Sequence, residues 1–219
     1  MEISGLNKIM DAIGDAFSIF DFSFFISGAA TLGFVMLDMH YYGHDGILGL
    51  DGWKGGVIFL LAIYICGLMS WCAGKFLRQR IIAFVRHDCN WMSKDLKTLM
   101  DELMDDKQKK DLEALDYPAK YTALWIKLCK DEVMTKRVAF VNRMWVMQAV
   151  FEGLIASWVV GLFVYFDGCL IGGWIHLGKC GLWFAPIAIL FALIGLSVQR
   201  ATDYAESQIK EVVLATQNK

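Results

Sequence analysis

Four apolar stretches constrain the fold of this chain more than any other feature. They cover residues 22–37, 55–74, 147–166 and 182–198. The hydrocarbon core of a bilayer is about 30 Å thick, and a helix needs about 20 apolar residues to cross it. The second and third stretches have this length, while the first and fourth are slightly shorter and would draw on aromatic residues of the interface. The sequence therefore predicts four transmembrane helices.

The composition supports a membrane protein. Of the 219 residues 57% are hydrophobic, and only two are prolines. The mean hydropathy is +0.45, which is too apolar for an ordinary soluble domain of this length. We therefore expect an all-α integral membrane protein whose first partner is the lipid bilayer.

The placement of lysine and arginine predicts the orientation of the helices, because positively charged loops stay on the cytoplasmic side. Lys54 and Lys179 are the only basic residues in the connectors that follow the first and third apolar stretches. The remaining basic residues lie before the first stretch, between the second and third, or after the fourth. This predicts a multi-pass protein of the bacterial inner membrane with both termini in the cytoplasm.

This topology divides the chain into five parts. Residues 1–20 carry one apolar stripe, which predicts an amphipathic helix that packs on the cytoplasmic helices or lies flat on the inner interface. The other parts are a transmembrane hairpin over residues 21–75, a cytoplasmic helical hairpin over 76–146, a second transmembrane hairpin over 147–199, and a cytoplasmic helix or tail over 200–219.

The middle segment contains one proline and no glycine between residues 76 and 146, which predicts two long helices. Asp116 can cap the second helix, and Pro118 suits its first turn. At about 1.5 Å per residue, each arm would extend some 40 Å, so the flanking transmembrane helices could continue into it. Apolar stripes on both arms would pack together; they comprise Met92, Leu96, Leu99 and Leu103, and Tyr121, Leu124 and Leu128.

Small residues recur at helical spacing in the third and fourth apolar stretches. Such residues let helix backbones approach closely where lipid provides no hydrophobic drive to associate. They predict a packing face on each helix, and four helices of one chain would use only part of this surface, so we expect a homo-oligomer. The residues are Gly153, Ser157 and Gly161 on the third helix, and Ala188, Ala192 and Gly195 on the fourth.

Glu152 lies well inside the third stretch, one turn after Gln148. Ionisable groups inside a membrane are costly and are candidates for function. One hypothesis makes the two residues part of a pore, in which a ring of carboxylates from several subunits favours cations. The alternative is a glutamate that reaches the inner interface or bonds a neighbouring helix.

Lys107, Lys109 and Lys110 stand near the expected tip of the cytoplasmic hairpin. An oligomer would gather them into a basic ring that could hold an anion, a nucleotide or an oligonucleotide, or contact a cytoplasmic protein. The simpler interpretation is a solvated helix on which neighbouring aspartates balance the lysines.

The outward connectors contain residues that could suggest a metal or redox site. His40 and His44 have the spacing of a two-histidine metal site, but Gly43 predicts that no helix continues through them, so we expect no metal. Cys169 and Cys180 are candidates for a structural disulfide. Redox catalysis is a minor alternative, because the chain lacks a Cys-x-x-Cys motif.

We find no catalytic motif and expect neither an enzyme nor a cofactor. The sequence predicts a non-enzymatic, homo-oligomeric, channel-like effector. Its cytoplasmic helices would gate it or dock a soluble partner. Its layout is similar to that of small four-helix membrane effectors of bacterial phage-defence systems, and this resemblance in topology implies a role in phage defence. The alternative is a membrane interaction protein, such as a plasmid entry-exclusion, immunity or secretion-assembly subunit.

Overall fold

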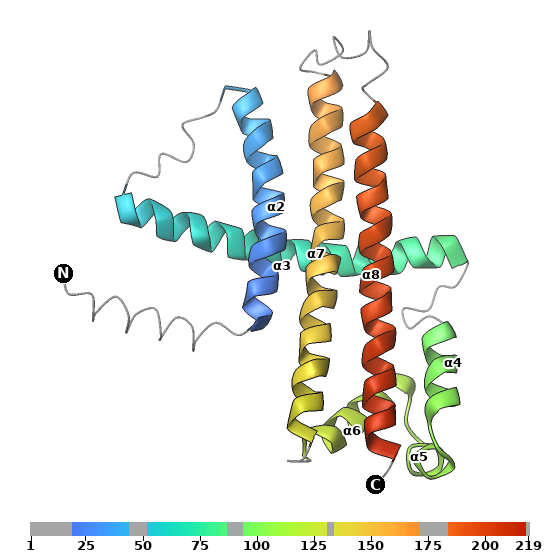
Figure 1. Ribbon diagram of the computed structural model, residues 1–219. Helices are drawn as coiled ribbons and strands as arrows, with labels where there is room; N and C mark the ends of the chain where they lie inside the picture. The colour runs from blue at the N-terminus through green and yellow to red at the C-terminus, as the bar shows by residue number, and fades with distance from the viewer. Residues whose placement is uncertain (1–18, 44–51, 87–93, 131–133, 171–183, 218–219) are drawn as a thin grey trace, which may run out of the picture. The chain divides into compact units, whose positions relative to one another are not determined.

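The computed structural model describes residues 19–43, 52–86, 94–130, 134–170 and 184–217. These residues are almost entirely helical, and no strand occurs among them. The helices, labelled in Figure 1, are α2 (Ile19–Tyr41), α3 (Gly52–Arg86), α4 (Lys94–Leu103), α5 (Asp106–Asp111), α6 (Tyr117–Cys129), α7 (Thr135–Leu170) and α8 (Phe184–Gln217).

Four of these helices, α2, α3, α7 and α8, are long and apolar enough to span a membrane. They confirm the prediction of an all-helical chain with four such helices and are consistent with a multi-pass membrane protein. Three of them extend well beyond the apolar stretches, because the adjoining polar residues are also strong helix formers. Residues 200–217 accordingly belong to α8 and form no separate tail.

The first long helix ends where the sequence predicts. Gly43 has φ of 73°, a left-handed conformation that glycine adopts without strain. Its amide donates to the carbonyl of His40 at 3.0 Å, which closes the last turn of α2. The expected amphipathic helix over residues 1–20 lies, except for its last two residues, outside the described residues.

The expectation of two long helical arms between residues 76 and 146 is wrong. Asp105 starts the short helix α5, because its side chain accepts from the Gln108 amide at 2.7 Å while the Gln108 side chain accepts from the Asp105 amide. This reciprocal capping box interrupts the predicted first arm. Asp116 caps α6 and Pro118 lies in its first turn, as the sequence predicts.

The chain divides into two compact units. Unit 1 comprises Met1–Phe76 and Ala149–Val198, and unit 2 comprises Leu77–Gln148 and Gln199–Lys219. The boundaries fall inside α3, α7 and α8, so each of these helices contributes to both units.

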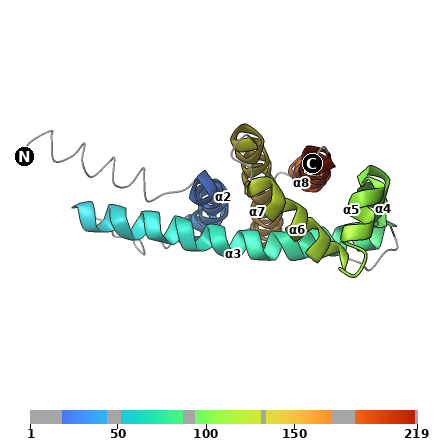
Figure 2. The same cartoon turned by 90° about the horizontal axis from the view of Figure 1, so that it is seen from below.

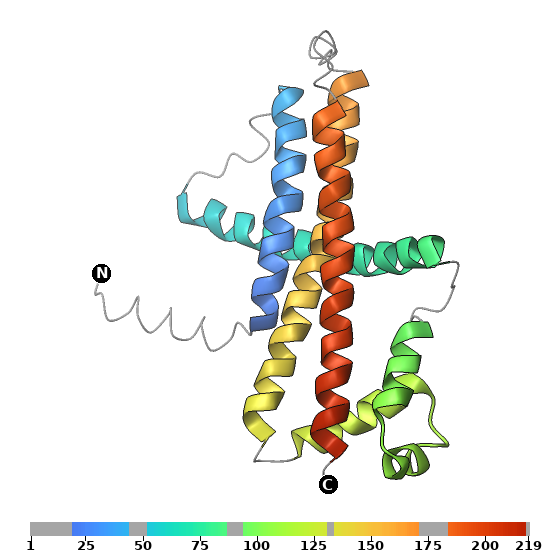
Figure 3. The same cartoon turned by 45° about the vertical axis from the view of Figure 1, so that its right-hand side comes forward.

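In unit 1, α2 and α7 run side by side in the same direction. Midway along α2, Thr31 shares a hydrogen bond with Ser157; farther along, the hydroxyl of Tyr42, just after the end of α2, donates to Asp167 near the end of α7. Residues 184–198 of α8 run alongside α7 (Figure 3), where Trp158 of α7 donates to Ser197 at 3.3 Å. This arrangement covers one side of α7 with α2 and another with α8.

Helix α3 contacts α2 and α7 of unit 1 at a crossing. The contacts gather between residues 63 and 74 of α3, where Gly28 and Gly67 bring α2 and α3 together and Gly74 meets α7. Figures 1 and 2 show the α3 ribbon running across α2 at this place. Only glycine allows such an approach, because an added Cβ at any of the three would lie under 2.0 Å from a backbone oxygen.

Unit 2 has a conventional hydrophobic core. It joins α4, α6, the first part of α7 and the last part of α8. Leu96 and Leu103 of the first predicted stripe meet the second stripe here, whereas Met92 lies outside the described residues. The last part of α8 adds apolar residues that the sequence does not single out. The buried residues are Met100, Met104, Leu124, Leu128, Val141, Ile209, Val212, Val213 and Ala215.

Candidate functional site

Glu152 is buried inside unit 1. Its side chain is 2% exposed, and its Oε2 accepts a hydrogen bond from the indole Nε1 of Trp71 at 3.0 Å. The two residues lie on α7 and α3, and the Gly74 contact at the same crossing brings the α3 backbone against the Glu152 carbonyl. The indole N–H thus provides a hydrogen-bond donor to a carboxyl group that is removed from solvent.

Three hydroxyls form a second polar group in the same unit. Thr31 Oγ1 lies 2.7 Å from Ser70 Oγ and 2.8 Å from Ser157 Oγ, so that one threonine on α2 bridges α3 and α7. The Ser157 hydroxyl also lies 3.0 Å from the Ser27 carbonyl and 3.1 Å from that of Gly153. We call Ser27, Thr31, Ser70, Trp71, Glu152 and Ser157 the polar seam.

Small residues keep the polar seam closed. A Cβ added at Gly153 would lie 2.5 Å from the Cβ of Ser27, so α2 and α7 are in direct contact there. A Cβ at Gly161 would lie 2.8 Å from the ring of Phe34, a side chain that can yield more easily. The structure thus brings the predicted small residues of α7 together with α2, while their role in assembly stays a prediction.

The exterior of unit 1 is apolar. Large hydrophobic side chains of α3, α7 and α8 face outward, whereas the hydroxyls of Ser23, Ser27 and Ser157 are fully buried. This distribution suits a lipid surround, in which polar groups must find partners inside the protein. The exposed side chains include Val57, Ile58, Leu60, Leu61, Ile65, Met69, Phe163, Ile189, Phe191 and Leu196.

The small-residue face of α8 points away from the chain's own helices. Ala188, Ala192 and Gly195 are exposed. No heavy atom of the described residues lies within 4 Å of a Cβ added at Gly195. The predicted packing partner of this face is therefore absent from the described part of the chain.

Gln148 makes its contact in unit 2. Its Oε1 accepts from Gln208 Nε2 of α8 at 2.7 Å. Gln148 thus bonds a residue of unit 2, whereas Glu152, predicted to share a polar stripe with it, bonds Trp71 of unit 1. Their joint role in a pore stays a prediction.

The lysines of α5 flank a buried glutamine in the sequence. Lys107, Lys109 and Lys110 are exposed, whereas Gln108 is 4% exposed and donates to Thr216 Oγ1 of α8 at 2.9 Å. The Lys127 ammonium donates to the Thr216 carbonyl at 3.3 Å, which suits the negative end of a helix dipole. The α5 lysines are thus held on a small helix that is fastened to the end of α8.

Tyrosines of unit 2 have raised pKa values. Burial raises the pKa of Tyr121 to about 12, although a hydrogen bond from the indole of Trp145 partly opposes the shift. The Tyr117 hydroxyl donates to Asp101, and this bond is the main cause of its raised pKa. Both phenols are therefore protonated near neutral pH and belong to the structure of the unit.

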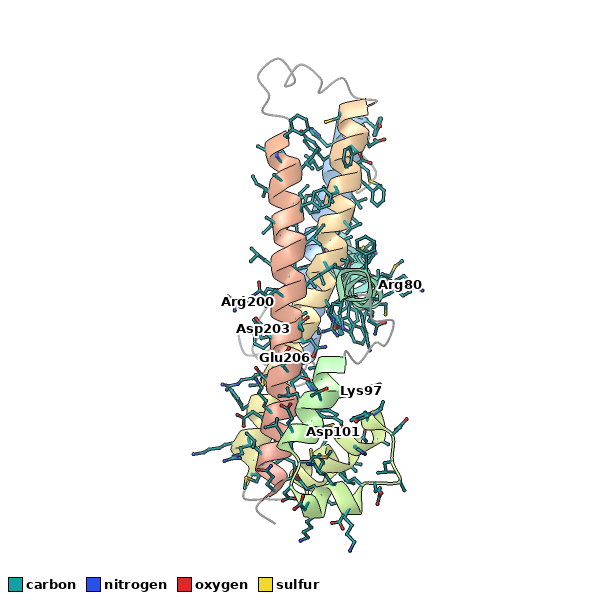
Figure 4. The ribbon with its side chains drawn as sticks, turned by 90° about the vertical axis from the view of Figure 1, so that its right-hand side faces the viewer. Arg80, Lys97, Asp101, Arg200, Asp203 and Glu206 are labelled. Carbon is teal, nitrogen blue, oxygen red and sulfur yellow. The ribbon has the colours of Figure 1, made fainter. Side chains whose placement is uncertain are left out.

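The surface of unit 2 is charged. Arg200, Asp203 and Glu206 follow one another along one side of α8 (Figure 4), and Arg200 lies 3.9 Å from Asp203. Lys97 and Asp101 lie on α4. Exposed pairs of this kind contribute little to stability.

The connectors that the sequence predicts to face outward are only partly described. Cys169 is half-buried near the end of α7, whereas Cys180 lies outside the described residues, so their disulfide stays a prediction. His44 and His176 also lie outside them. Within the described ranges no group of three His, Cys, Asp or Glu side chains is placed to hold a metal ion.

Trp71 and the hydroxyls of α2 and α3 are the members of the polar seam that sequence reasoning missed. A signal was present, because Ser23, Ser27 and Thr31 recur at every fourth residue of an apolar stretch. The same spacing rule identified the small residues of α7. Nothing in the local sequence indicates that Trp71 bonds Glu152, which lies 81 residues later in the chain.

The fold and the polar seam define a class: an all-helical protein with four helices able to span a membrane. The sequence matches no protein-family model, and no curated protein or solved structure is similar enough to match it.

Proposed function

We propose that the chain is a homo-oligomeric, channel-like effector of the bacterial inner membrane and that it catalyses no reaction. The polar seam carries this proposal, because hydroxyls and a carboxylate are buried inside a unit whose exterior is apolar. Such groups are costly in a membrane and are retained where ions pass. The seam is closed by direct helix contacts, so conduction requires an opening step.

Unit 2 is the regulatory part of this proposal. Its α5 lysines are exposed and fastened to α8 through Gln108, and α8 continues without interruption to Phe184. A cytoplasmic protein, a nucleotide or an oligonucleotide that contacts Lys107, Lys109 and Lys110 would act on the same helix that contributes to unit 1. The layout of phage-defence effectors is the reason for proposing that setting.

The test is ion flux from the purified protein in planar bilayers. We expect a cation-selective current that Glu152→Gln reduces without loss of assembly, because the substitution removes the negative charge and keeps the shape. Glu113→Gln is the matched control, since Glu113 is exposed on unit 2 and lies outside the polar seam. Wild-type protein that passes no current under any applied voltage or ligand would overturn the proposal.

A second candidate is a membrane interaction protein that blocks or completes a partner complex. The exposed small-residue face of α8 favours it, because Ala188, Ala192 and Gly195 could receive a helix from another protein. Ala192→Cys, in a chain whose six native cysteines are replaced, distinguishes the two by oxidative cross-linking in membranes. A cross-link to a second copy supports the oligomer, and one to a different polypeptide at fixed stoichiometry supports the interaction protein.

A further inference from the structure

We infer that the ion path lies inside each subunit, between α2, α3 and α7, and not on the axis of an oligomer. This inference rests on the proposed channel function and specifies its permeant: a small hard cation, bound by carboxylate, hydroxyl and carbonyl oxygens. In the closed state, the hydrogen bond from Trp71 to Glu152 holds α3 against α7.

The burial of the polar seam within one chain is the first argument. Ser27 and Ser157 have no exposed surface, Glu152 is 2% exposed and Ser70 is 4% exposed. These values arise from the chain's own helices, so no second copy is needed to cover the seam. A carboxylate ring on an oligomer axis would instead require Glu152 on the outer surface of each subunit.

The arrangement of oxygen atoms is the second argument. Around the Ser157 hydroxyl lie the Thr31 hydroxyl at 2.8 Å and the carbonyls of Ser27 and Gly153 at 3.0 and 3.1 Å. The Ser70 hydroxyl extends the group to α3 at 2.7 Å from Thr31. A hydroxyl donates one hydrogen bond and offers two lone pairs, so rotation of these groups would present oxygens to a cation. Hard cations favour such ligands.

The contact between α3 and α7 is the third argument, because it identifies the moving part. A Cβ added at Gly74 would lie 1.6 Å from the Glu152 carbonyl oxygen, so the backbones touch beside the carboxyl group. A cation cannot pass while this contact persists. Displacement of α3 from α7 would break the bond from Trp71 to the carboxylate and separate Ser70 from Thr31.

A subunit-mixing experiment tests the position of the path. Wild-type and Glu152→Gln chains with different affinity tags are co-assembled at known ratios and reconstituted. A path inside each subunit predicts current that falls in direct proportion to the mutant fraction. A shared axial ring predicts a steep power-law fall, and that result, or a Glu152→Gln chain with wild-type current, would overturn the inference while leaving channel function intact.

The hydrogen bond from Trp71 to Glu152, which we call the latch between α3 and α7, has its own test. Trp71→Phe keeps an aromatic ring and removes the indole donor, so we expect the open probability to rise about tenfold or more, as a lost hydrogen bond to a charged group implies. Trp158→Phe is the matched control, because Trp158 donates to Ser197 of α8, outside the polar seam. An equal effect of the two substitutions would contradict the latch.

Thiol labelling provides a readout that does not depend on Glu152. Thr31→Cys and Ser157→Cys, each in a chain without the native cysteines, should react with a small cationic thiosulfonate only under conducting conditions. Gly33→Cys is the control, because Gly33 is exposed on the outside of α2 and should remain unreactive in lipid. Conducting protein in which neither seam position reacts would overturn the internal path, whereas absence of wild-type current would overturn the channel function itself.

Discussion

The two units expose opposite kinds of side chain. Unit 2 buries methionine, leucine and valine and exposes lysine, aspartate and arginine. Unit 1 buries serine hydroxyls and Glu152 together with apolar residues such as Phe24, Ile155 and Leu162, and exposes isoleucine, leucine and phenylalanine. The hydrophobic effect drives the first arrangement in water. The second is stable where lipid removes that drive and close packing with internal hydrogen bonds remains.

This difference means that stability should respond to opposite changes in the two units. In unit 2 the removal of methylene groups leaves cavities in the core. In unit 1 the addition of a methyl group at a glycine crossing separates the helices. Four substitutions test this contrast, from the largest expected effect to the smallest.

Leu128→Ala should produce the largest loss. Leu128 is 1% exposed in the core of unit 2, and truncation of such a residue costs about 2–5 kcal/mol of unfolding free energy. Denaturant unfolding in detergent measures it, followed by the fluorescence of Trp125 and Trp145, whose ring centroids lie 5.0 Å apart. The exposed neighbour Ile126→Ala should change stability by no more than about 0.5 kcal/mol. Equal losses from the two would show that α6 does not pack as described.

Gly74→Ala should destabilise unit 1 by about 1–3 kcal/mol, because the added methyl group meets the Glu152 carbonyl. Thermal unfolding in lipid nanodiscs measures the loss. Gly33→Ala is the control: its methyl group meets no heavy atom of the described residues, so helix propensity should stabilise it by up to about 1 kcal/mol. If Gly74→Ala left the thermal stability unchanged, α3 would not contact α7 at Gly74 as described.

Gln108→Ala should cost about 1–2 kcal/mol, since it removes half of the capping box and the bond to Thr216. The change should also increase amide hydrogen exchange in the last turn of α8. Lys107→Ala, at the exposed neighbouring position, should leave both quantities close to wild type. If exchange at the end of α8 is unchanged in Gln108→Ala, α5 does not hold that helix.

The raised pKa of Tyr121 predicts that stability depends on this residue's protonation only in alkaline solution. Its hydroxyl has a pKa of about 12 when folded against an ordinary value of 10.0, so the unfolded chain loses its proton first as pH rises. The contribution of Tyr121 to the free energy of unfolding is therefore fully present below pH 10.0. Above this pH it falls by about 1.4 kcal/mol per pH unit until the folded pKa is reached. Unfolding at pH 9 and about pH 11 in wild type and Tyr121→Phe measures the slope, which should be smaller in the variant, where the raised pKa of Tyr117 still contributes. An equal slope in Tyr121→Phe would show that Tyr121 does not cause it.

The sequence predicts the helices of this chain well because their signals are local. Apolar length marked the four long helices, Gly43 marked the end of α2, and Asp116 with Pro118 marked the start of α6. Asp105 was missed, because its capping box depends on a glutamine inside a lysine-rich run that otherwise favours a continuous helix.

The candidate site was less predictable, because its contacts join distant parts of the chain. Glu152 was recognised as a costly charge, but its partner Trp71 lies on another helix. The role of Gly74 likewise depends on where α3 crosses α7. Spacing shows which face of a helix is small or polar, and does not reveal which other helix meets that face.

The unit boundaries inside α3, α7 and α8 have a consequence for how this chain can change over time. Neither unit can be lost, duplicated or exchanged as a cassette, because no loop separates it from the other at these three places. An insertion of one residue at a boundary would rotate everything beyond it by about 100°, whereas seven residues nearly restore the angular register. Length variation in relatives of this chain is therefore expected in the connectors between helices, and the three shared helices should vary in sequence at constant length.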